Sequence, residues 1–102
     1  MNQEDLAMGL IVAAGNAKSL AMEVIKLAKQ GKFPEAEAQY KLAEEGMVGA
    51  HRQQTEILQQ SFECPEEGVT MLMSHAQDHM MNAITTVDLA REFLDLYQII
   101  LR

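Results

Sequence analysis

The stretch MLMSHAQDHMMNAITTVDLAREFLDLYQII, residues 71–100, carries two apolar stripes, whereas a helix in a small bundle needs only one. At about 100° per residue, the first stripe groups residues suited to a core. Its members are Met73, Ala76, Met80, Ile84, Val87, Leu94 and Leu101, the last just beyond the quoted stretch. The second stripe, roughly a quarter turn away, contains Leu72, Leu89, Phe93, Leu96 and Ile100. A three-helix monomer readily covers one stripe, so the second predicts self-association.

Two breaks precede this helix and divide the rest of the chain. KQGKFPEAE, residues 29–37, contains Gly31, which suits a helix end, and Pro34, which suits the first turn of the next helix. SFECPEEGVT, residues 61–70, is a longer loop. The pattern predicts helices over residues 4–30, 35–60 and 70–101. Because short connections join antiparallel neighbours, we expect an all-α, antiparallel up-down-up three-helix bundle in which residues 1–102 form one domain.

The first two helices each show one amphipathic stripe. In the first helix the predicted core residues are Leu6, Leu10, Ala13, Ala17, Leu20, Val24 and Leu27. In the second they are Ala36, Tyr40, Ala43, Met47, Ala50, Ile57 and Leu58. The middle of the first helix reads AAGNA, and such small side chains let another helix approach closely.

Composition narrows the class of protein. Hydrophobic residues make up 48% of the 102 residues and charged residues 23%, as expected of one globular domain. The formal charge of −7 argues against a nucleic-acid partner, because phosphate binding needs a basic surface. The apolar runs are shorter than a membrane span and the acidic N-terminus does not resemble a signal peptide. With one cysteine, Cys64, we expect no internal disulfide and a cytoplasmic location.

A polar cluster interrupts the second stripe of the third helix. His75, Asp78, His79 and Asn82 fall at spacings of three, four and seven residues, which place them on one helix face. The cluster therefore lies on the predicted subunit interface. Buried imidazoles and carboxylates are costly unless they are paired. Three interpretations remain open from the residues alone: a structural polar network, a shared metal site, or a histidine used in chemistry.

Several specific metal sites fit the pattern poorly. The helical zinc-protease motif needs a glutamate beside its first histidine, and Ala76 stands there. A di-iron carboxylate bundle needs two Glu-x-x-His pairs and two further glutamates, and this set is not in the sequence. Methionines near the histidines could suggest Cu(I), but methionine at helical spacing more often fills a core.

Three segments together point to a known family. They are GNAKS at residues 15–19, AHRQQTE at residues 50–56 and HAQDH at residues 75–79, in that order. With these segments, nearly the whole chain resembles the IIA components of the lactose/cellobiose (chitobiose) class of the bacterial phosphoenolpyruvate-dependent sugar phosphotransferase system. The sequence departs from the family in the SFECPEEG loop and at Ser74, where an apolar residue is expected.

The resemblance implies a fold, a reaction and partners. Family members are three-helix bundles assembled as homotrimers, and His75 corresponds to their phosphorylated histidine. Asp78 corresponds to the aspartate whose three copies meet around a Mg²⁺ ion. The phosphorylated histidine-containing carrier protein is the implied donor, and a cysteine of the cognate IIB component is the implied acceptor. The chain would thus be a phosphotransferase component that acts during uptake of a lactose-, cellobiose- or chitobiose-type sugar.

The neighbouring residues suit this chemistry. A neutral imidazole is a competent nucleophile, and phosphoryl transfer needs donors for the equatorial oxygens. His79 and Asn82 are candidates for that role, with interface hydrogen bonding as the alternative. Gln77, on the opposite side with Asp88 and Asp95, is expected to be solvated or partner-facing. The competing interpretation of the whole chain is a non-catalytic helical scaffold whose His/Asp cluster is only an interface network.

Overall fold

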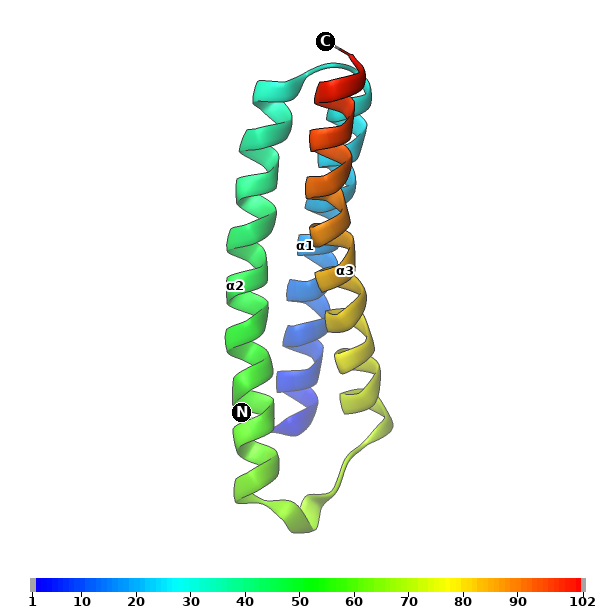
Figure 1. Ribbon diagram of the computed structural model, residues 1–102. Coiled ribbons are helices and arrows are strands. Elements are labelled where there is room, and N and C mark those ends of the chain that lie inside the picture. The colour runs from blue at the N-terminus through cyan, green and yellow to red at the C-terminus, as the bar shows by residue number, and fades with distance from the viewer. Residues whose placement is uncertain (1, 102) are drawn as a thin grey trace.

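The computed structural model describes residues 2–101, and among them it contains helices and no strand. The elements are α1 (Gln3–Lys29), α2 (Phe33–Glu63), a 3₁₀ turn η1 (Pro65–Glu67) and α3 (Met71–Ile100). Figure 1 shows the chain running the length of the molecule three times, along α1, back along α2 and forward again along α3. The predicted all-α class and the three helices are confirmed. The second helix extends further than expected, to Glu63, and the turn η1 was not predicted.

The connection between α1 and α2 has the conformation that its residues predict. Gly31 adopts φ +74°, a left-handed conformation that favours glycine. The Gly31 N–H donates to the Ala28 carbonyl at 3.0 Å, and the Lys32 N–H donates to the Leu27 carbonyl at 3.0 Å. This pair of bonds is a Schellman motif, which satisfies carbonyls that the end of α1 leaves open. Pro34 then lies in the first turn of α2, so the connection is short and the two helices are neighbours.

The second connection ends at a helix cap. The Thr70 side chain accepts a hydrogen bond from the Met73 backbone N–H at 3.1 Å and so caps α3. This cap marks where α3 begins, five residues before His75.

The core is built largely from alanines at seven-residue intervals. In α1 the buried residues are Ala7, Leu10, Ala14, Ala17, Ala21, Val24 and Ala28. In α2 they are Ala36, Ala43, Met47, Ala50 and Ile57. In α3 they are Met73, Ala76, Met80, Ala83, Val87, Ala90 and Leu94. A heptad of small residues lets helix backbones approach closely.

The alanine core corrects several predicted core residues. Leu6, Leu20 and Leu27 are only half-buried and flank the core, since alanines occupy the line of closest approach. Leu58 and Leu101 are exposed, at 48% and 47%. Leu58 borders an open hollow near the end of α2, and Leu101 lies beyond the end of α3. We predicted these leucines in the core because they are hydrophobic. The distance between neighbouring helices instead decides which residue lies at the centre of the core.

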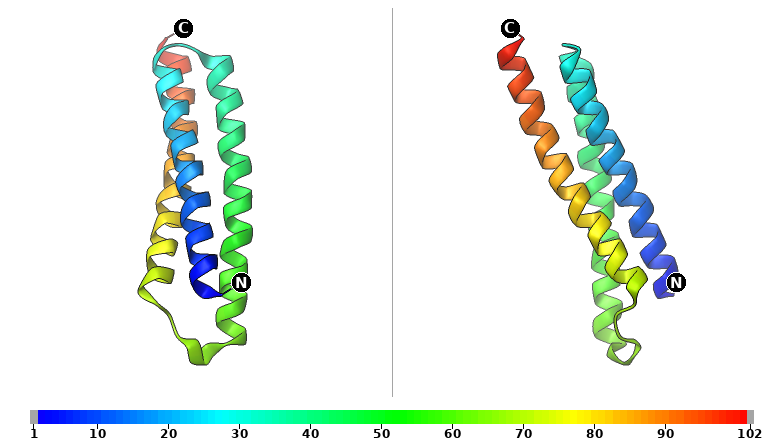
Figure 2. Two further views of the ribbon diagram at one scale, coloured as in Figure 1. Left: turned by 180° about the vertical axis from the view of Figure 1, so that it is seen from behind. Right: turned by 90° about the vertical axis from the view of Figure 1, so that its right-hand side faces the viewer.

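The three helices do not contact one another equally. α1 packs extensively against both α2 and α3, while α2 and α3 contact each other much less. Figure 2 shows α1 and α3 side by side and running in the same direction, in an elongated molecule of 57 × 17 × 16 Å. By length and composition alone α1 could cross a membrane. Its alanine stripe is buried in the bundle.

Candidate functional site

His75 and His79 meet on the face of α3 that points away from the core. Their Nε2 atoms are 3.1 Å apart. The rings meet edge to face, with centroids 4.6 Å apart and planes at 90°. His75 is exposed and His79 is half-buried. The i, i+4 spacing predicted that these histidines share a face, and the structure brings them into direct contact.

This contact constrains where the protons lie. A hydrogen bond between two neutral imidazoles needs a proton on one Nε2 and a lone pair on the other. If His79 donates, the Nε2 lone pair of His75 is the acceptor and is directed toward its neighbour. His75 is also the more exposed of the two rings, so an incoming group can reach it. When this hydrogen bond opens, the arrangement offers a nucleophilic nitrogen with an N–H donor beside it.

Asp78 and Asn82 lie on the same face and are exposed. Among residues 2–101, the structure records no hydrogen bond or ion pair for the Asp78 carboxylate. The backbone carbonyl of Asn82 accepts a hydrogen bond from the Thr86 hydroxyl at 2.8 Å, and its side chain faces solvent. Both predicted residues therefore border the histidine pair without contacting it through a recorded hydrogen bond.

The described residues of a single chain do not by themselves form a metal site. In the described part of the chain, no group of three or more His, Cys, Asp and Glu side chains is placed to hold an ion. Asp78 offers the carboxylate oxygens that Mg²⁺ prefers, but a complete set of ligands would have to come from further copies of Asp78 and from water. The donor chemistry fits the ion only in an assembly of chains.

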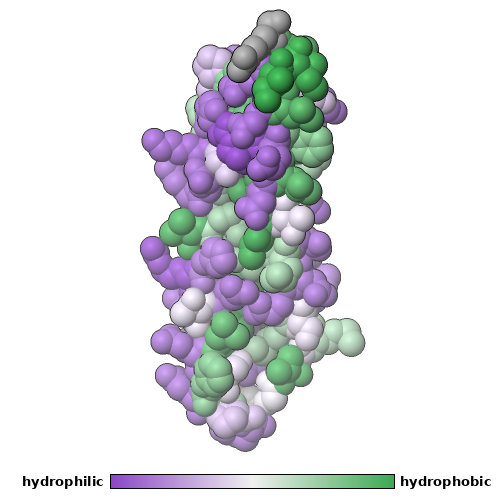
Figure 3. Space-filling model, viewed as in Figure 1, coloured by the Kyte–Doolittle hydropathy of each residue, from purple (hydrophilic) through white to green (hydrophobic). Residues whose placement is uncertain are grey.

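The polar face continues into an apolar surface. Leu89, Phe93, Leu96 and Ile100 are exposed by 50%, 39%, 48% and 61%. Figure 3 shows apolar side chains gathered at the upper end of the molecule, over the end of α3. These four residues lie outside the core, as the second stripe predicted. Leu72, assigned to the same stripe, instead packs partly against the core.

Gln77 corrects one prediction. It was expected on a solvated or partner-facing side, yet it is half-buried and its Oε1 accepts a hydrogen bond from Gln54 Nε2 at 2.7 Å. The bond joins α2 to α3 on the side of α3 that faces away from the histidine pair. Gln54 lies in the AHRQQTE segment, but spacing along one helix cannot identify a partner on another.

A second tie joins α2 and α3 near their other ends. The Arg91 guanidinium donates two hydrogen bonds of 2.8 Å to the Glu37 carboxylate and also binds Asp95. It lies over the Tyr40 ring, 5.1 Å from the centroid. Hydrogen bonding from Arg91 holds the pKa of Glu37 below its ordinary value, and the two carboxylates raise the pKa of Arg91. Burial, reinforced by Glu44, raises the pKa of Tyr40.

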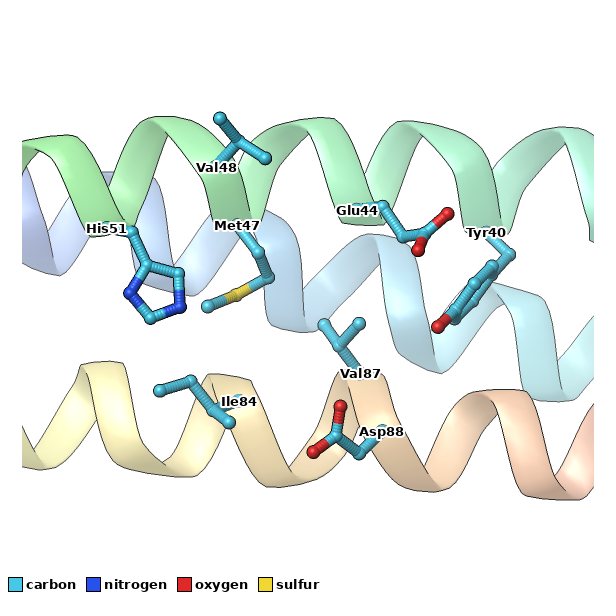
Figure 4. A pocket seen from close by; sticks show the side chains of 8 residues that line it. All are labelled: Tyr40, Glu44, Met47, Val48, His51, Ile84, Val87 and Asp88. Carbon is cyan, nitrogen blue, oxygen red and sulfur yellow. The ribbon is translucent and has the colours of Figure 1, made fainter.

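Two hollows flank these ties. The groove between α2 and α3 is lined by Tyr40, Glu44, Met47, Val48, His51, Ile84, Val87 and Asp88 (Figure 4). A more apolar hollow lies between the end of α2 and the start of α3 and includes Ile57, Leu58, Phe62, Val69 and Met73, with Asp78 at its border. Sequence reasoning identified neither hollow, because both depend on the angle between α2 and α3.

Comparison with known proteins places the chain among sugar phosphotransferase components. The family model described as "PTS system, Lactose/Cellobiose specific IIA subunit" matches residues 5–98. A galactose-specific EIIA component of Lactococcus lactis subsp. cremoris is 47% identical over 87 residues, which are 85% of this chain and 75% of that protein.

Two solved structures share the fold closely. The cellobiose-specific enzyme IIA from Bacillus anthracis superposes with a TM-score of 0.90 at 43% identity, covering 98% of this chain and 92% of that one. The IIA(Chitobiose)–HPr complex from Escherichia coli gives a TM-score of 0.82 at 30% identity, covering 100% of this chain and 99% of that one. In that complex a IIA protein of this fold binds HPr.

Proposed function

This chain belongs to the lactose/cellobiose-specific IIA family of the sugar phosphotransferase system, and we propose that it is a phosphocarrier that uses His75. It accepts a phosphoryl group from a phosphorylated histidine-containing carrier protein and passes it to a cysteine of a IIB component. The observation that carries the proposal is the exposed His75 ring, whose Nε2 lies 3.1 Å from His79 Nε2. The cellobiose and chitobiose specificities of its relatives suggest a sugar of that class.

The first transfer forms a nitrogen–phosphorus bond. A lone pair on the His75 imidazole attacks phosphorus, and the bond between phosphorus and the donor's histidine nitrogen breaks, returning its electron pair to the donor. In the second transfer a cysteine thiolate attacks the same phosphorus and His75 leaves as a neutral imidazole. Neither step needs a further acid or base beyond the proton positions of the two rings, so positioning supplies most of the catalysis.

His79 is proposed to stabilise the phosphoryl group. When its Nε2–H donates to His75, this hydrogen bond breaks as the His75 Nε2 lone pair turns to attack phosphorus. Once that lone pair binds phosphorus, the same N–H is free to donate to a phosphoryl oxygen. A fixed N–H donor beside developing negative charge is the usual source of stabilisation in such transfers. Asn82, exposed one turn further along the helix, is the second candidate donor.

Self-association is the second part of the proposal. Leu89, Phe93, Leu96 and Ile100 are at least one-third exposed and continue the face that carries His75. An exposed stripe of large apolar side chains on one helix is stabilised when copies of the chain pack it together. We propose a homotrimer with this stripe at its centre. A subunit groove around His75 would also keep water from the stored phosphoryl group.

Asp78 gives the proposed trimer an ion site. Three copies of this exposed carboxylate brought to one axis would repel one another. Mg²⁺ would relieve that repulsion with three carboxylates and water as oxygen ligands. The ion's proposed role is to neutralise charge and hold the assembly together. We propose that the chain works in the cytoplasm, where its phosphoryl donor is found.

One experiment separates a carrier from a scaffold. The protein is incubated with the phosphorylated histidine-containing carrier protein, and any phosphate that it takes up is tested for acid lability. A carrier gains one phosphoryl group that is lost in mild acid and survives in base, as a phosphorus–nitrogen bond does. A helical scaffold whose histidines only bind each other gains none.

A further inference from the structure

The groove between α2 and α3 has the geometry of a four-helix bundle that lacks one helix. α1 packs along both α2 and α3, whereas α2 and α3 contact each other little. In a four-helix bundle, the two helices that flank a common neighbour lie on a diagonal. The fourth corner, opposite α1, is where the groove lies. Its α2 wall runs from Tyr40 to His51, a length of roughly 17 Å at 1.5 Å per residue.

Polar contacts between α2 and α3 lie at both ends of this groove. Arg91 binds Glu37 and covers Tyr40 at the upper end, and Gln54 binds Gln77 at the lower end. These contacts join α2 to α3 on either side of the groove. A preformed groove loses less conformational freedom on binding than one that must open.

The lining combines an apolar floor with an acidic rim. Figure 4 shows Met47, Ile84 and Val87 between the two helices, with the Glu44 and Asp88 carboxylates on opposite walls. The lining residues include two carboxylates and one imidazole, His51, and no lysine or arginine. Burial is the main reason that the pKa of Tyr40 is raised; Glu44 and Asp88 add to the increase, and Arg91 opposes it.

The groove is separate from the proposed phosphoryl-transfer face. Ile84 lies nine residues after His75, which is about 900° of helical rotation and hence half a turn away. The exposed stripe that includes Phe93 lies on the same side as His75. A partner in the groove and a phosphoryl donor at His75 would therefore approach opposite sides of α3.

We propose that this groove binds an amphipathic helix of a partner protein, one that has an apolar face flanked by lysine and arginine. Such a helix would complete the bundle, its apolar side chains covering Met47, Ile84 and Val87. Its basic flanks would pair with Glu44 on one wall and Asp88 on the other. Helix-in-groove recognition uses this combination of apolar anchors and charged edges. A second copy of this chain, with its charge of −7, would bring repulsion to the same rim.

The test uses two matched synthetic helices and the full-length protein. The first probe is a labelled, end-capped peptide of about 16 residues with leucines along one face and lysine and arginine beside them. The second keeps the leucine face and replaces every basic residue by glutamate. Binding is followed by fluorescence anisotropy, and the site is mapped by NMR shifts of the Ile84 and Val87 methyls, with those of Leu42 as an off-groove reference.

Matched protein variants locate the charge effect. Glu44→Lys/Asp88→Lys reverses the rim, while Glu45→Lys/Glu56→Lys makes the same change in net charge at exposed positions of α2 outside the groove lining. We expect the basic peptide to bind the wild type and the control, and to bind the rim variant roughly tenfold or more weakly at low salt. The acidic peptide should fail to bind the wild type.

Three outcomes would overturn the proposal. In the first, the basic peptide binds both double variants equally weakly. In the second, the methyl shifts are centred outside the groove. In the third, the rim variant alone loses self-association, which would assign the groove to a second copy of the chain. Phosphoryl uptake on His75 should be unchanged in Glu44→Lys/Asp88→Lys. The docking proposal can therefore fail while the carrier function stands, and the carrier function can fail while the docking proposal stands.

Discussion

The Nε2 atoms of His75 and His79 lie 3.1 Å apart across one turn of α3, and their rings meet at 90°. In a hydrogen bond between these two nitrogens one ring donates an N–H and the other accepts it, and the tautomer decides which ring does which. One histidine is thereby supplied with a directed lone pair and the other with a directed N–H. The two rings differ in exposure, since His75 faces solvent and His79 is half-buried.

Replacing His79 should slow phosphoryl uptake without abolishing it. His79→Ala removes an N–H donor beside the phosphoryl oxygens, and loss of one such donor typically costs on the order of 100-fold in rate. His79→Gln, whose terminal amide can occupy the place of Nε2, should recover part of the rate. Rapid-quench measurement of single-turnover transfer from the phosphorylated carrier protein gives both values. His51→Ala, an exposed histidine on α2, is the matched control and should behave as wild type; a wild-type rate for His79→Ala would remove His79 from the mechanism.

The exposed stripe on α3 should control assembly. Phe93→Glu places a charge in the proposed seam between subunits, so the oligomer should dissociate or the protein unfold. Leu42→Glu adds the same charge at a half-exposed leucine on α2 and should leave the oligomer intact. Light scattering measures the mass of each variant. A monomeric wild type at micromolar concentration would contradict self-association through this stripe.

Asp78 should link stability to a divalent cation. Chelation is expected to lower the melting temperature of the wild type, and added Mg²⁺ to restore it, because the ion binds the assembled state. Asp78→Asn should lose this response. Asp78→Leu should lose it too, with a stability equal to or above that of the ion-free wild type where the larger side chain fits. Asp88→Asn, another exposed carboxylate on α3, serves as the control; full Mg²⁺ stabilisation in Asp78→Asn would move the ion elsewhere.

The ion pair between Glu37 and Arg91 should stabilise the fold in a pH-dependent way. Hydrogen bonding to Arg91 lowers the pKa of Glu37 from 4.5, so its contribution is complete above that value and is lost as the pH falls through the lower, folded value. Glu37 is nearly half exposed, so solvent screening limits the effect at neutral pH to about 0.2–1 kcal/mol. Denaturant unfolding of wild type and Glu37→Gln should therefore differ at pH 7 and converge in acid.

The control for the ion pair is Glu45→Gln, an exposed glutamate on the same helix. It should match the wild type at every pH. A gap between wild type and Glu37→Gln that persists unchanged into strong acid would show that the carboxylate charge is not the cause.

Periodicity predicted the parts of the fold that depend on one helix at a time. The breaks at Gly31 and Pro34 and the shared face of His75 and His79 follow from local geometry, and the structure bears them out. The burial of small residues such as Ala83 and Ala90 was missed. Alanine becomes central only when a neighbouring helix is close, which a single helical pattern does not report.

The contacts between α2 and α3 could not be predicted from the sequence for the same reason. Gln77 was expected in solvent, but the angle between the helices brings it to Gln54. Arg91 reaches Glu37 across 54 residues of sequence. Both ties, and the groove between them, depend on how two helices are inclined, and hydrophobic patterning leaves that inclination undetermined.

The central claim is that His75 carries the phosphoryl group, and site-resolved phosphorylation tests it most directly. Wild type, His75→Ala and His79→Ala are each incubated with the phosphorylated histidine-containing carrier protein, and uptake is followed by intact-mass spectrometry, with circular dichroism as the check on folding. We predict one phosphoryl group on the wild type, slower uptake of one group by His79→Ala, and none on His75→Ala, whose helical content stays intact. Uptake by folded His75→Ala at the wild-type rate would contradict the assignment of His75.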